Sequence, residues 1–262
     1  MEFRPCIDIH NGQVKQIVGS SLEDQGDQAK ENFVAANDAE YYAQLYRENG
    51  IRGGHIILLN PVSSPYYEAT RAQAMCALAA YPGGLQIGGG VNADNAAEYL
   101  EAGASHVIVT SYVFQGGRIN MEHLDRISRA VGKEHLVLDL SCRMKNGSYY
   151  IVTDRWQKFT EEQVDGRTLD RLTDYCDEFL IHAVDVEGKS QGIEETLVRQ
   201  LGEWCSRPGK IAVTYAGGVH DYEDIELLRA LGGGRVHVTV GSALDIFGGN
   251  LVFGEVLRRI RN

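Results

Sequence analysis

The sequence predicts a (β/α)₈ barrel, of the TIM type, made of two similar halves. The chain has 262 residues, and three of its features recur at nearly one spacing. His106-Val107-Ile108-Val109-Thr110-Ser111 returns 131 positions later (237 − 106) as His237-Val238-Thr239-Val240-Gly241-Ser242. Gly88-Gly89-Gly90 returns after 128 positions (216 − 88) as Ala216-Gly217-Gly218, and Asp8 returns after 131 (139 − 8) as Asp139. A spacing close to half the chain length indicates an internal duplication.

Eight strand-like segments alternate with eight helix-like segments, which predicts a parallel sheet. The strand segments are short and largely apolar, as strands buried on both faces are. They cover residues 3–9, 55–59, 85–87, 106–110, 135–140, 178–184, 211–215 and 236–240. Eight units and a twofold repeat favour closure into a barrel over the alternative, an open doubly wound sheet.

The helix-like segments have an amphipathic period and are bounded by capping residues. Asp38 and Asp221 are placed as N-caps, and Gly50 and Gly103 follow the ends of two helices. The segments cover residues 38–46, 66–80, about 92–103, 121–131, 160–176, 193–204, 221–231 and 253–260.

Short hairpins are expected to interrupt the alternation. Asn11-Gly12 predicts a tight turn that leads into a strand over 13–18, and Asn146-Gly147 predicts a second turn. Residues 19–36 are polar without a period and predict a mobile loop. No composition break divides the chain, so one barrel domain over 1–262 is expected.

Composition narrows the class of function. The net charge of −11 argues against nucleic acid or an anionic membrane as partner. No apolar run approaches the length of about 20 residues that a membrane span needs, and no leader-like segment precedes the first strand. The five cysteines form no C-x-x-C and no metal-ligand spacing, which indicates reduced thiols. We expect a cytoplasmic monomer that acts on a small molecule without metal or cofactor.

The repeated glycine and serine motifs predict two anion sites. Glycines after a strand let the backbone approach a bound group, and the N–H groups of a following helix favour an anion. A hydroxyl at the end of the next strand adds a donor. Two such sites suit a substrate with a phosphate at each end. The candidate residues are Gly89, Gly90, Thr110 and Ser111 in the first half and Gly217, Gly218, Gly241 and Ser242 in the second.

Catalytic candidates lie where the strands end, at the face that carries the active site in such barrels. Asp8 and Asp139 belong to opposite strands, and two carboxylates in different surroundings can serve as base and acid. A carboxylate in an apolar strand can also be structural, and His182 can be either a core histidine or an acid. Ser141 should face the same side as Asp139. Trp156 could stack on a heterocycle or anchor its loop.

Five motifs lie at the strand ends along the chain: Cys6-Ile7-Asp8-Ile9-His10-Asn11-Gly12, Gln86-Ile87-Gly88-Gly89-Gly90, Val109-Thr110-Ser111, Tyr215-Ala216-Gly217-Gly218 and Val240-Gly241-Ser242. Together they resemble the histidine-biosynthesis barrel family, along essentially the whole chain. The family comprises ProFAR isomerases (phosphoribosylformimino-aminoimidazole-carboxamide ribotide isomerases) and the cyclase subunits of imidazole glycerol phosphate synthase. Two further segments, Asp139-Leu140-Ser141-Cys142-Arg143 and His182-Ala183-Val184-Asp185-Val186-Glu187-Gly188, resemble the isomerase form of fungi and plants.

The resemblance implies an Amadori rearrangement of an aminoaldose to an aminoketose, without metal or cofactor. It assigns catalysis to Asp8 and Asp139, with His182 in place of a bacterial threonine, and substrate contacts to Trp156, Ser141 and Arg143. The bacterial Asp-Leu-Asp of the second strand is replaced here by Leu58-Leu59-Asn60.

Two alternatives remain open on the sequence. A cyclase carries a lysine where Gln16 stands, although Lys15 is adjacent. A phosphosugar-binding barrel without catalysis would also need the anion sites, but it would gain nothing from an aspartate that faces its ligand.

Overall fold

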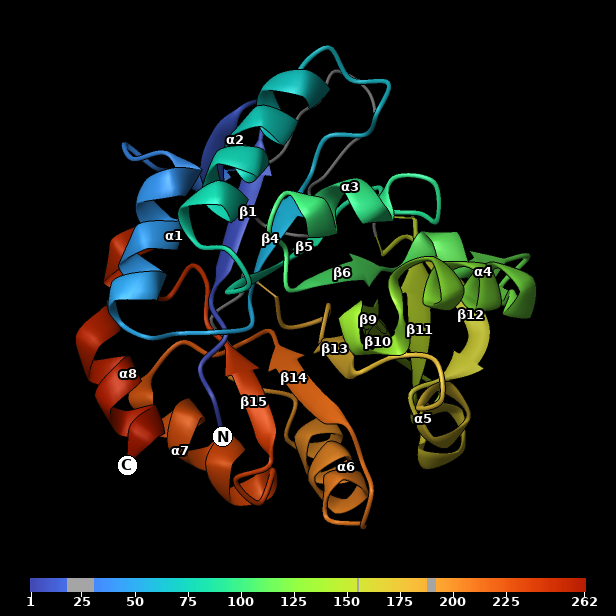
Figure 1. Cartoon of the computed structure of the whole chain (residues 1–262). Coiled ribbons are helices and arrows are strands. Elements are labelled where there is room, and N and C mark those ends of the chain that lie inside the picture. The colour runs from blue at the N-terminus through green and yellow to red at the C-terminus, as the bar shows by residue number, and fades with distance from the viewer. Residues whose placement is uncertain (18–30, 155, 188–191) are drawn as a thin grey trace.

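A sheet of parallel strands closes on itself to form the core of the molecule (Figure 1). The computed structural model describes residues 1–17, 31–154, 156–187 and 192–262. The barrel strands follow the order β15-β14-β13-β9-β6-β5-β4-β1. They are β1 (Cys6–His10), β4 (Gly54–Leu58), β5 (Leu85–Gly88), β6 (His106–Val109), β9 (Leu136–Asp139), β13 (Glu178–His182), β14 (Ala212–Ala216) and β15 (Val236–Thr239).

The N-terminal segment closes the barrel. Phe3 forms a parallel bridge with Val238 of β15, and the Arg4 N–H donates to the Val238 carbonyl at 2.8 Å. The Val238 N–H donates in turn to the Glu2 carbonyl at 2.9 Å. Both edges of the parallel sheet are thereby joined, which confirms the barrel and excludes the open doubly wound sheet.

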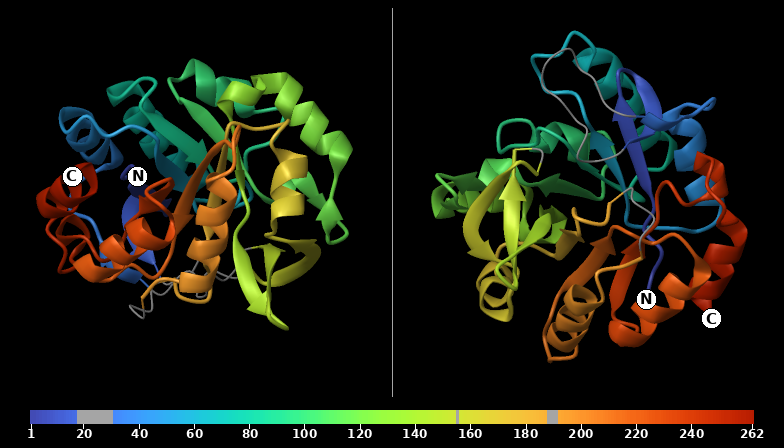
Figure 2. Two further views of the ribbon diagram at one scale, coloured as in Figure 1. Left: turned by 90° about the horizontal axis from the view of Figure 1, so that it is seen from below. Right: turned by 180° about the vertical axis from the view of Figure 1, so that it is seen from behind.

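One α-helix follows each barrel strand, and the helices lie around the outside of the sheet (Figure 2). The N-caps predicted at Asp38 and Asp221 are confirmed, since their carboxylates accept from Tyr41 N and Asp224 N. Among the described residues, no helix has the length and apolar character needed to cross a membrane. The helices are α1 (Ala39–Glu48), α2 (Tyr67–Ala80), α3 (Ala96–Glu101), α4 (Met121–Val131), α5 (Gly166–Leu172), α6 (Glu195–Cys205), α7 (Tyr222–Leu231) and α8 (Phe253–Arg261).

Short additional strands and 3₁₀ turns lie in the loops of the barrel. The predicted turn at Asn11-Gly12 is present, with φ of +52° and +73°, the left-handed pair that a two-residue hairpin requires. The additional strands are β2 (Gln13–Ile17), β3 (Glu31–Val34), β7 (Phe114–Gln115), β8 (Arg118–Ile119), β10 (Cys142–Lys145), β11 (Ser148–Thr153) and β12 (Lys158–Gln163). The 3₁₀ turns are η2 (Ser111–Val113), η3 (Lys133–His135) and η4 (Asp245–Phe247).

The helix predicted over 160–176 is wrong in its first part. Residues of β12 pair instead with β11 in a three-stranded antiparallel sheet, and α5 begins only after Asp165, whose carboxylate accepts from Thr168 N at 2.8 Å. Thr160 is buried and donates to the Ile151 carbonyl at 2.8 Å. Pairing with β11 satisfies a backbone that lacks an apolar helical stripe, so tertiary context overrides local preference.

The loop predicted over 19–36 is wrong at its C-terminal end. β3 pairs antiparallel with β2, with Val34 opposite Lys15 and Phe33 opposite Gln16. Residues 18–30, to which most of that prediction refers, lie outside the described residues.

Side chains that point into the barrel form layers, as period-two alternation requires. Ile57, Ile108, Val137, Leu180 and Ala216 form an apolar layer across the interior. Toward the N-terminal ends of the strands, Arg4 and the buried Glu178 form an ion pair, and Gln86 Nε2 donates to Glu178 at 2.6 Å. These layers fill the lower barrel and leave the C-terminal end open for a site.

Candidate active site

Two pockets open at the C-terminal ends of the barrel strands and adjoin each other. We call them the Asp8 pocket and the Ser111 pocket. Both include four residues in their linings, Ile57, Leu59, Asp139 and Trp156. The remaining lining of the Asp8 pocket is Cys6, Asp8, His55, Leu180, His182, Glu187, Ala216, Gly217, Gly218, Val219, Thr239, Val240, Gly241 and Ser242. That of the Ser111 pocket is Gly88, Gly89, Gly90, Val91, Ile108, Thr110, Ser111, Tyr112, Val152, Thr153 and Asp154.

The duplicated glycine and serine motifs fall into separate pockets. Gly217, Gly218, Gly241 and Ser242 line the Asp8 pocket, whereas Gly89, Gly90, Thr110 and Ser111 line the Ser111 pocket. The structure therefore brings all eight anion-site candidates to the mouth of the barrel, in two groups with the shared wall between them.

Glycine is required where the two loops touch a neighbouring strand. Gly89 has φ +99°, and a Cβ there would overlap the Leu58 carbonyl. Gly217 has φ +118°, and a Cβ would lie 2.7 Å from the Ala183 carbonyl oxygen. Both loops thus present bare backbone to the cavity.

The described residues supply uncharged donors at these loops. Among them, neither pocket lining contains a lysine or an arginine. Backbone N–H groups and the hydroxyls of Ser111 and Ser242 are donors in the described lining, and each serine stands beside a strand end, Ser111 at the start of the short helix η2. Loops at strand ends together with a short extra helix are a common phosphate site in such barrels.

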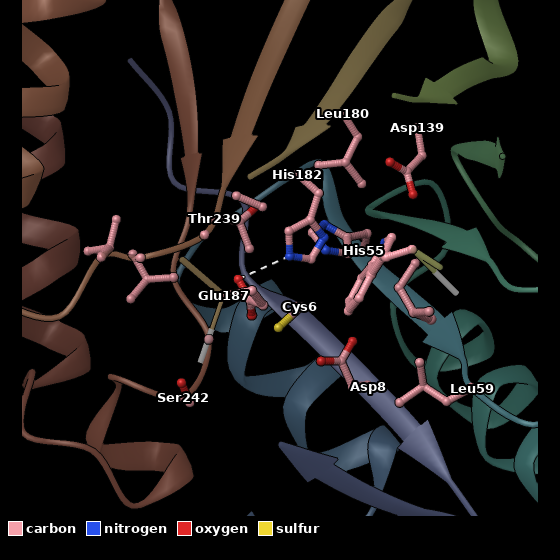
Figure 3. A pocket seen from close by; sticks show the side chains of 18 residues that line it. Cys6, Asp8, His55, Leu59, Asp139, Leu180, His182, Glu187, Thr239 and Ser242 are labelled. Carbon is pink, nitrogen blue, oxygen red and sulfur yellow. Dashed lines mark ion pairs between the residues drawn. The ribbon is translucent and has the colours of Figure 1, made fainter. Parts of the chain in front are cut away.

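Asp8 stands on the inward face of β1 at the floor of its pocket (Figure 3). Burial raises the pKa of its carboxyl to about 7, and the nearby Glu187 carboxylate acts in the same direction. His182 opposes both by stabilising the ionised form. A carboxylate with a pKa near neutrality can take up and release a proton at physiological pH.

Asp139 lies opposite Asp8, since β1 and β9 are separated by three strands on one side of the eight-stranded barrel. Its carboxylate accepts from Ser141 N at 2.8 Å, Ser141 Oγ at 2.7 Å and Thr110 Oγ1 at 3.1 Å. Burial still raises the pKa of Asp139, because its effect exceeds the opposing effects of His182 and these hydrogen bonds. Asp139 is therefore held in one orientation, with a pKa above that of an ordinary aspartate.

His182 lines the Asp8 pocket together with Asp8 and Asp139. Its Nε2 forms an ion pair with Glu187 at 3.0 Å, without the alignment of a hydrogen bond (Figure 3). Burial lowers the pKa of His182, but Glu187, Asp139 and Asp8 together outweigh burial and raise the pKa above its ordinary value. The three neighbouring carboxylates thus favour the protonated form of His182.

The twofold repeat is broken at His182. Asp8 pairs with Ile57, and its counterpart Asp139 pairs with Leu180. Leu59 lies two residues after Ile57, and His182 lies two residues after Leu180. Leu59 therefore occupies in the first half of the chain the position that His182 occupies in the second half. The two ends of the site are alike in their glycine and serine loops but different in their titratable groups.

Trp156 belongs to the wall that the two pockets share. It lies between β11 and β12 with φ +66°, a strained value for a bulky residue. Its indole ring meets the His182 imidazole edge-on, with centroids 4.9 Å apart and an angle of 66°. An aromatic ring held in this way can cover a planar ligand at the mouth of the barrel.

Ser141 and Arg143, predicted to contact substrate, line neither pocket. Ser141 is fully buried and bonds Asp139. Arg143 Nε donates to Asp185 at 2.8 Å, and its guanidinium lies 5.6 Å from the Phe159 ring centroid. In this structure Ser141 orients a carboxylate, and Arg143 ties β10 to the segment after β13.

The sequence reasoning missed four polar residues of the Asp8 pocket: Cys6, His55, Glu187 and Thr239. Glu187 belongs to the motif that begins at His182, and it could have indicated a third carboxylate beside Asp8 and Asp139. Burial, together with His182 and Arg4, lowers the pKa of His55 to about 3, so its ring is neutral. Cys6 and His55 could have been found by alternation, two positions before Asp8 and Ile57.

A group of metal-ligating residue types, His220, Asp221 and Asp224, occurs in the described part of the chain. Asp224 accepts from His220 Nδ1 at 2.6 Å, and the two aspartates form a reciprocal capping box at the start of α7. These contacts give the three residues a structural role, and we assign no metal to them.

A family model described as "Histidine biosynthesis protein" matches residues 2–251. The chain belongs to this family. The curated relatives span its length. A protein of Medicago truncatula, named as a chloroplastic 1-(5-phosphoribosyl)-5-((5-phosphoribosylamino)methylideneamino) imidazole-4-carboxamide isomerase, is 53% identical over 98% of this chain and 81% of its own. Isomerases with the same chemical name are 47% identical in Yarrowia lipolytica and 42% identical in Saccharomyces cerevisiae, each over 96% of this chain and 94% of the relative.

Proposed function

We propose that the protein is an isomerase that converts the aminoaldose ProFAR to the corresponding aminoketose in histidine biosynthesis. The observation that carries the proposal is the arrangement of two glycine-and-serine loops on either side of a cavity that holds Asp8 and Asp139. The imidazole-4-carboxamide in the relatives' names carries two phosphoribosyl groups. Such a ligand matches a site with an anion-binding loop at each end.

The reaction needs one acid and one base. The acid protonates the ring oxygen of the ribose aminal, the bond between C1 and that oxygen breaks, and a protonated Schiff base forms. The base then removes the proton from C2, which gives an enolamine. Return of a proton to C1 and loss of the C2 hydroxyl proton complete the aminoketose. No redox partner is consumed, because C1 is reduced as C2 is oxidised.

We assign the base to Asp8 and the acid to Asp139. A pKa of about 7 lets Asp8 be ionised and still accept a proton. Asp139 has a raised pKa and lies in the wall common to both pockets, where the middle of a ligand that spans them would lie. His182 is the competing acid, because Asp139 and Asp8 both raise its pKa above the ordinary value.

The remaining contacts are assigned by position. We propose that Trp156 covers the imidazole, and that the two loops bind one phosphate each. Ser141 and Arg143 act through Asp139 and Asp185 in the present structure, so we assign them support of the site.

Incubating the pure protein with ProFAR and following the aminoketose by chromatography tests the function. We expect complete conversion without added metal, cofactor or ammonia. A protein that binds ProFAR and returns it unchanged would be a phosphosugar binder. One that consumes the aminoketose with ammonia would be a cyclase, an alternative that the isomerase names of the reported relatives do not support.

We further propose that the protein acts as a monomeric one-domain barrel in the cytoplasm. The complete pair of loops within one chain supports the monomer. Light scattering after gel filtration tests it, and a mass of twice 28.9 kDa would contradict it. One relative is named chloroplastic, so imaging of a fluorescent fusion of the full-length protein is the test of location.

A further inference from the structure

Cys6 and Asp8 form a pair on the inward face of one strand. They are two residues apart on β1, so their side chains point to the same side. Both line the Asp8 pocket, with Cys6 one step deeper in the barrel, and Figure 3 shows the sulfur and the carboxylate directed into the same cavity. The thiol is buried.

The Cys6 sulfur is held from its other side by Gln16. Gln16 is buried, reaches the barrel from β2, and donates from Nε2 to Cys6 Sγ at 3.7 Å. Gly241 leaves room for this contact, because a Cβ there would lie 2.7 Å from Gln16 Oε1 and 3.3 Å from Cys6 Sγ. Because the sulfur already accepts, its S–H is free to donate, and a thiol has only one such proton.

The Cys6 thiol remains protonated at working pH. Burial and the neighbouring Asp8 carboxylate raise its pKa well above the ordinary value. A nucleophilic or metal-binding role requires the thiolate. A role as hydrogen-bond donor to Asp8 requires the protonated thiol instead.

Other groups that face Asp8 come from several elements. Two of them, His182 and Glu187, are ionisable and shift the pKa of Asp8 in opposite directions. His55 of β4 is neutral, and Tyr46 of α1 donates to the Cys6 carbonyl at 3.0 Å. The remaining neighbours supply no charge: Ile57 beside Asp8 in the sheet, and Thr239 and Gly241 in the pocket wall.

We propose that Cys6 is a positioning residue that orients the Asp8 carboxylate through its S–H group, with Gln16 holding the sulfur in place. The inference rests on the proposed function, in which Asp8 is the base. A thiol is a weak donor. It therefore fixes the direction of the carboxylate while removing little of the basicity that proton abstraction from C2 needs.

The test compares Cys6→Ala and Cys6→Ser with Cys176→Ala. Cys176 is an equally buried cysteine whose Sγ donates to the Leu172 carbonyl and which lines neither pocket. The readouts are the pH profile of kcat/KM with ProFAR and a ¹³C NMR titration of the Asp8 carboxyl.

Loss of the donor destabilises the ionised carboxylate, so Cys6→Ala should move the acid limb and the NMR midpoint upward by about half a pH unit or more. The hydroxyl of Cys6→Ser donates more strongly than a thiol and should leave both at or below the wild-type value. Cys176→Ala should leave both unchanged.

Unchanged midpoints in both Cys6 variants, or an equal shift in Cys176→Ala, would overturn the inference. The NMR titration needs no turnover, so it separates the two proposals. If the midpoint shifts in a protein that does not convert ProFAR, the result supports the contact between the Cys6 thiol and Asp8 and contradicts the proposed reaction.

Discussion

Asp8 places a carboxylate in surroundings that favour its neutral form. Its strand neighbours Ile7 and Ile9 are fully buried, and the carboxyl itself has a pKa of about 7 against an ordinary value of 3.8. Because the folded-state pKa exceeds the unfolded one, the folded state binds the proton more tightly. Stability contributed by the protonated carboxyl is present at low pH and is lost as pH rises from about 4 to about 7.

The variant Asp8→Asn should therefore be inactive and more stable at high pH. We expect turnover to fall by roughly 100-fold or more, since the amide cannot accept a proton. Thermal unfolding should show a Tm gain of about 2 °C or more at pH 8, and a smaller gain at pH 5. Asp174→Asn, at an exposed position, is the matched control. Retained turnover within a few-fold of wild type would remove Asp8 from the mechanism.

The identity of the acid is decided by two variants assayed across pH. Asp139→Asn should lose roughly 100-fold or more of its turnover at every pH. His182→Gln should keep measurable turnover. Its acid limb should move to higher pH, because the histidine lowers the pKa of Asp8. An active Asp139→Asn together with a His182→Gln that is inactive at every pH would make the histidine the acid.

At the scale of elements, the two halves supply matching loops and different chemistry. Loops after β5 and β6 form one group of backbone donors, and those after β14 and β15 form the other. Both halves have glycine at this position, because the close contact with Leu58 or Ala183 leaves no room for a Cβ. The two halves differ at Leu59 and His182.

The matching loops predict matching effects of Ser111→Ala and Ser242→Ala. Each variant removes a hydroxyl that we propose donates to a charged phosphate, so KM for ProFAR should rise roughly tenfold or more with kcat nearly unchanged. Ser206→Ala, whose hydroxyl bonds the Glu203 carbonyl on the surface, is the control. A crystal soaked in phosphate should hold one anion at each loop, and anions found only elsewhere would contradict the assignment.

At the scale of the whole molecule, the barrel is closed by the segment before β1. Arg4 links this segment to the interior, because its guanidinium pairs with the buried Glu178 of β13 and also with Glu2 at 2.9 Å. Glu178 accepts further bonds from Gln86 at 2.6 Å and Thr214 at 2.5 Å. This network joins the segment before β1 to β5, β13 and β14, beneath the apolar layer.

Arg4→Met should leave the Glu178 charge buried without its cation. We expect a loss of about 3–5 kcal/mol in the free energy of unfolding, measured by urea denaturation. The double variant Arg4→Met with Glu178→Leu should recover part of this loss, since it removes the unpaired charge as well. A single variant that costs less than about 1 kcal/mol would show that the pair contributes little to closure.

Much of the fold followed from local pattern. Apolar strands and capped helices of regular length predicted the eight units, and Asn11-Gly12 predicted its turn because that dipeptide suits two left-handed residues. The pattern was misleading at β12, where pairing with β11 outweighed a weak helical preference. The error lay outside the barrel, in a segment whose conformation depends on a partner strand.

The repeat, the barrel and the candidate residues at strand ends followed from the amino-acid pattern, because alternation along a buried strand decides which side chains face inward. Which of these side chains meet depends on the folded molecule. The contacts of His182 with Glu187 and Trp156, of Cys6 with Gln16, and of Arg4 with Glu178 join different elements. Their geometry depends on strand register and loop conformation around the closed barrel, and these are set by packing of the whole chain rather than by local sequence.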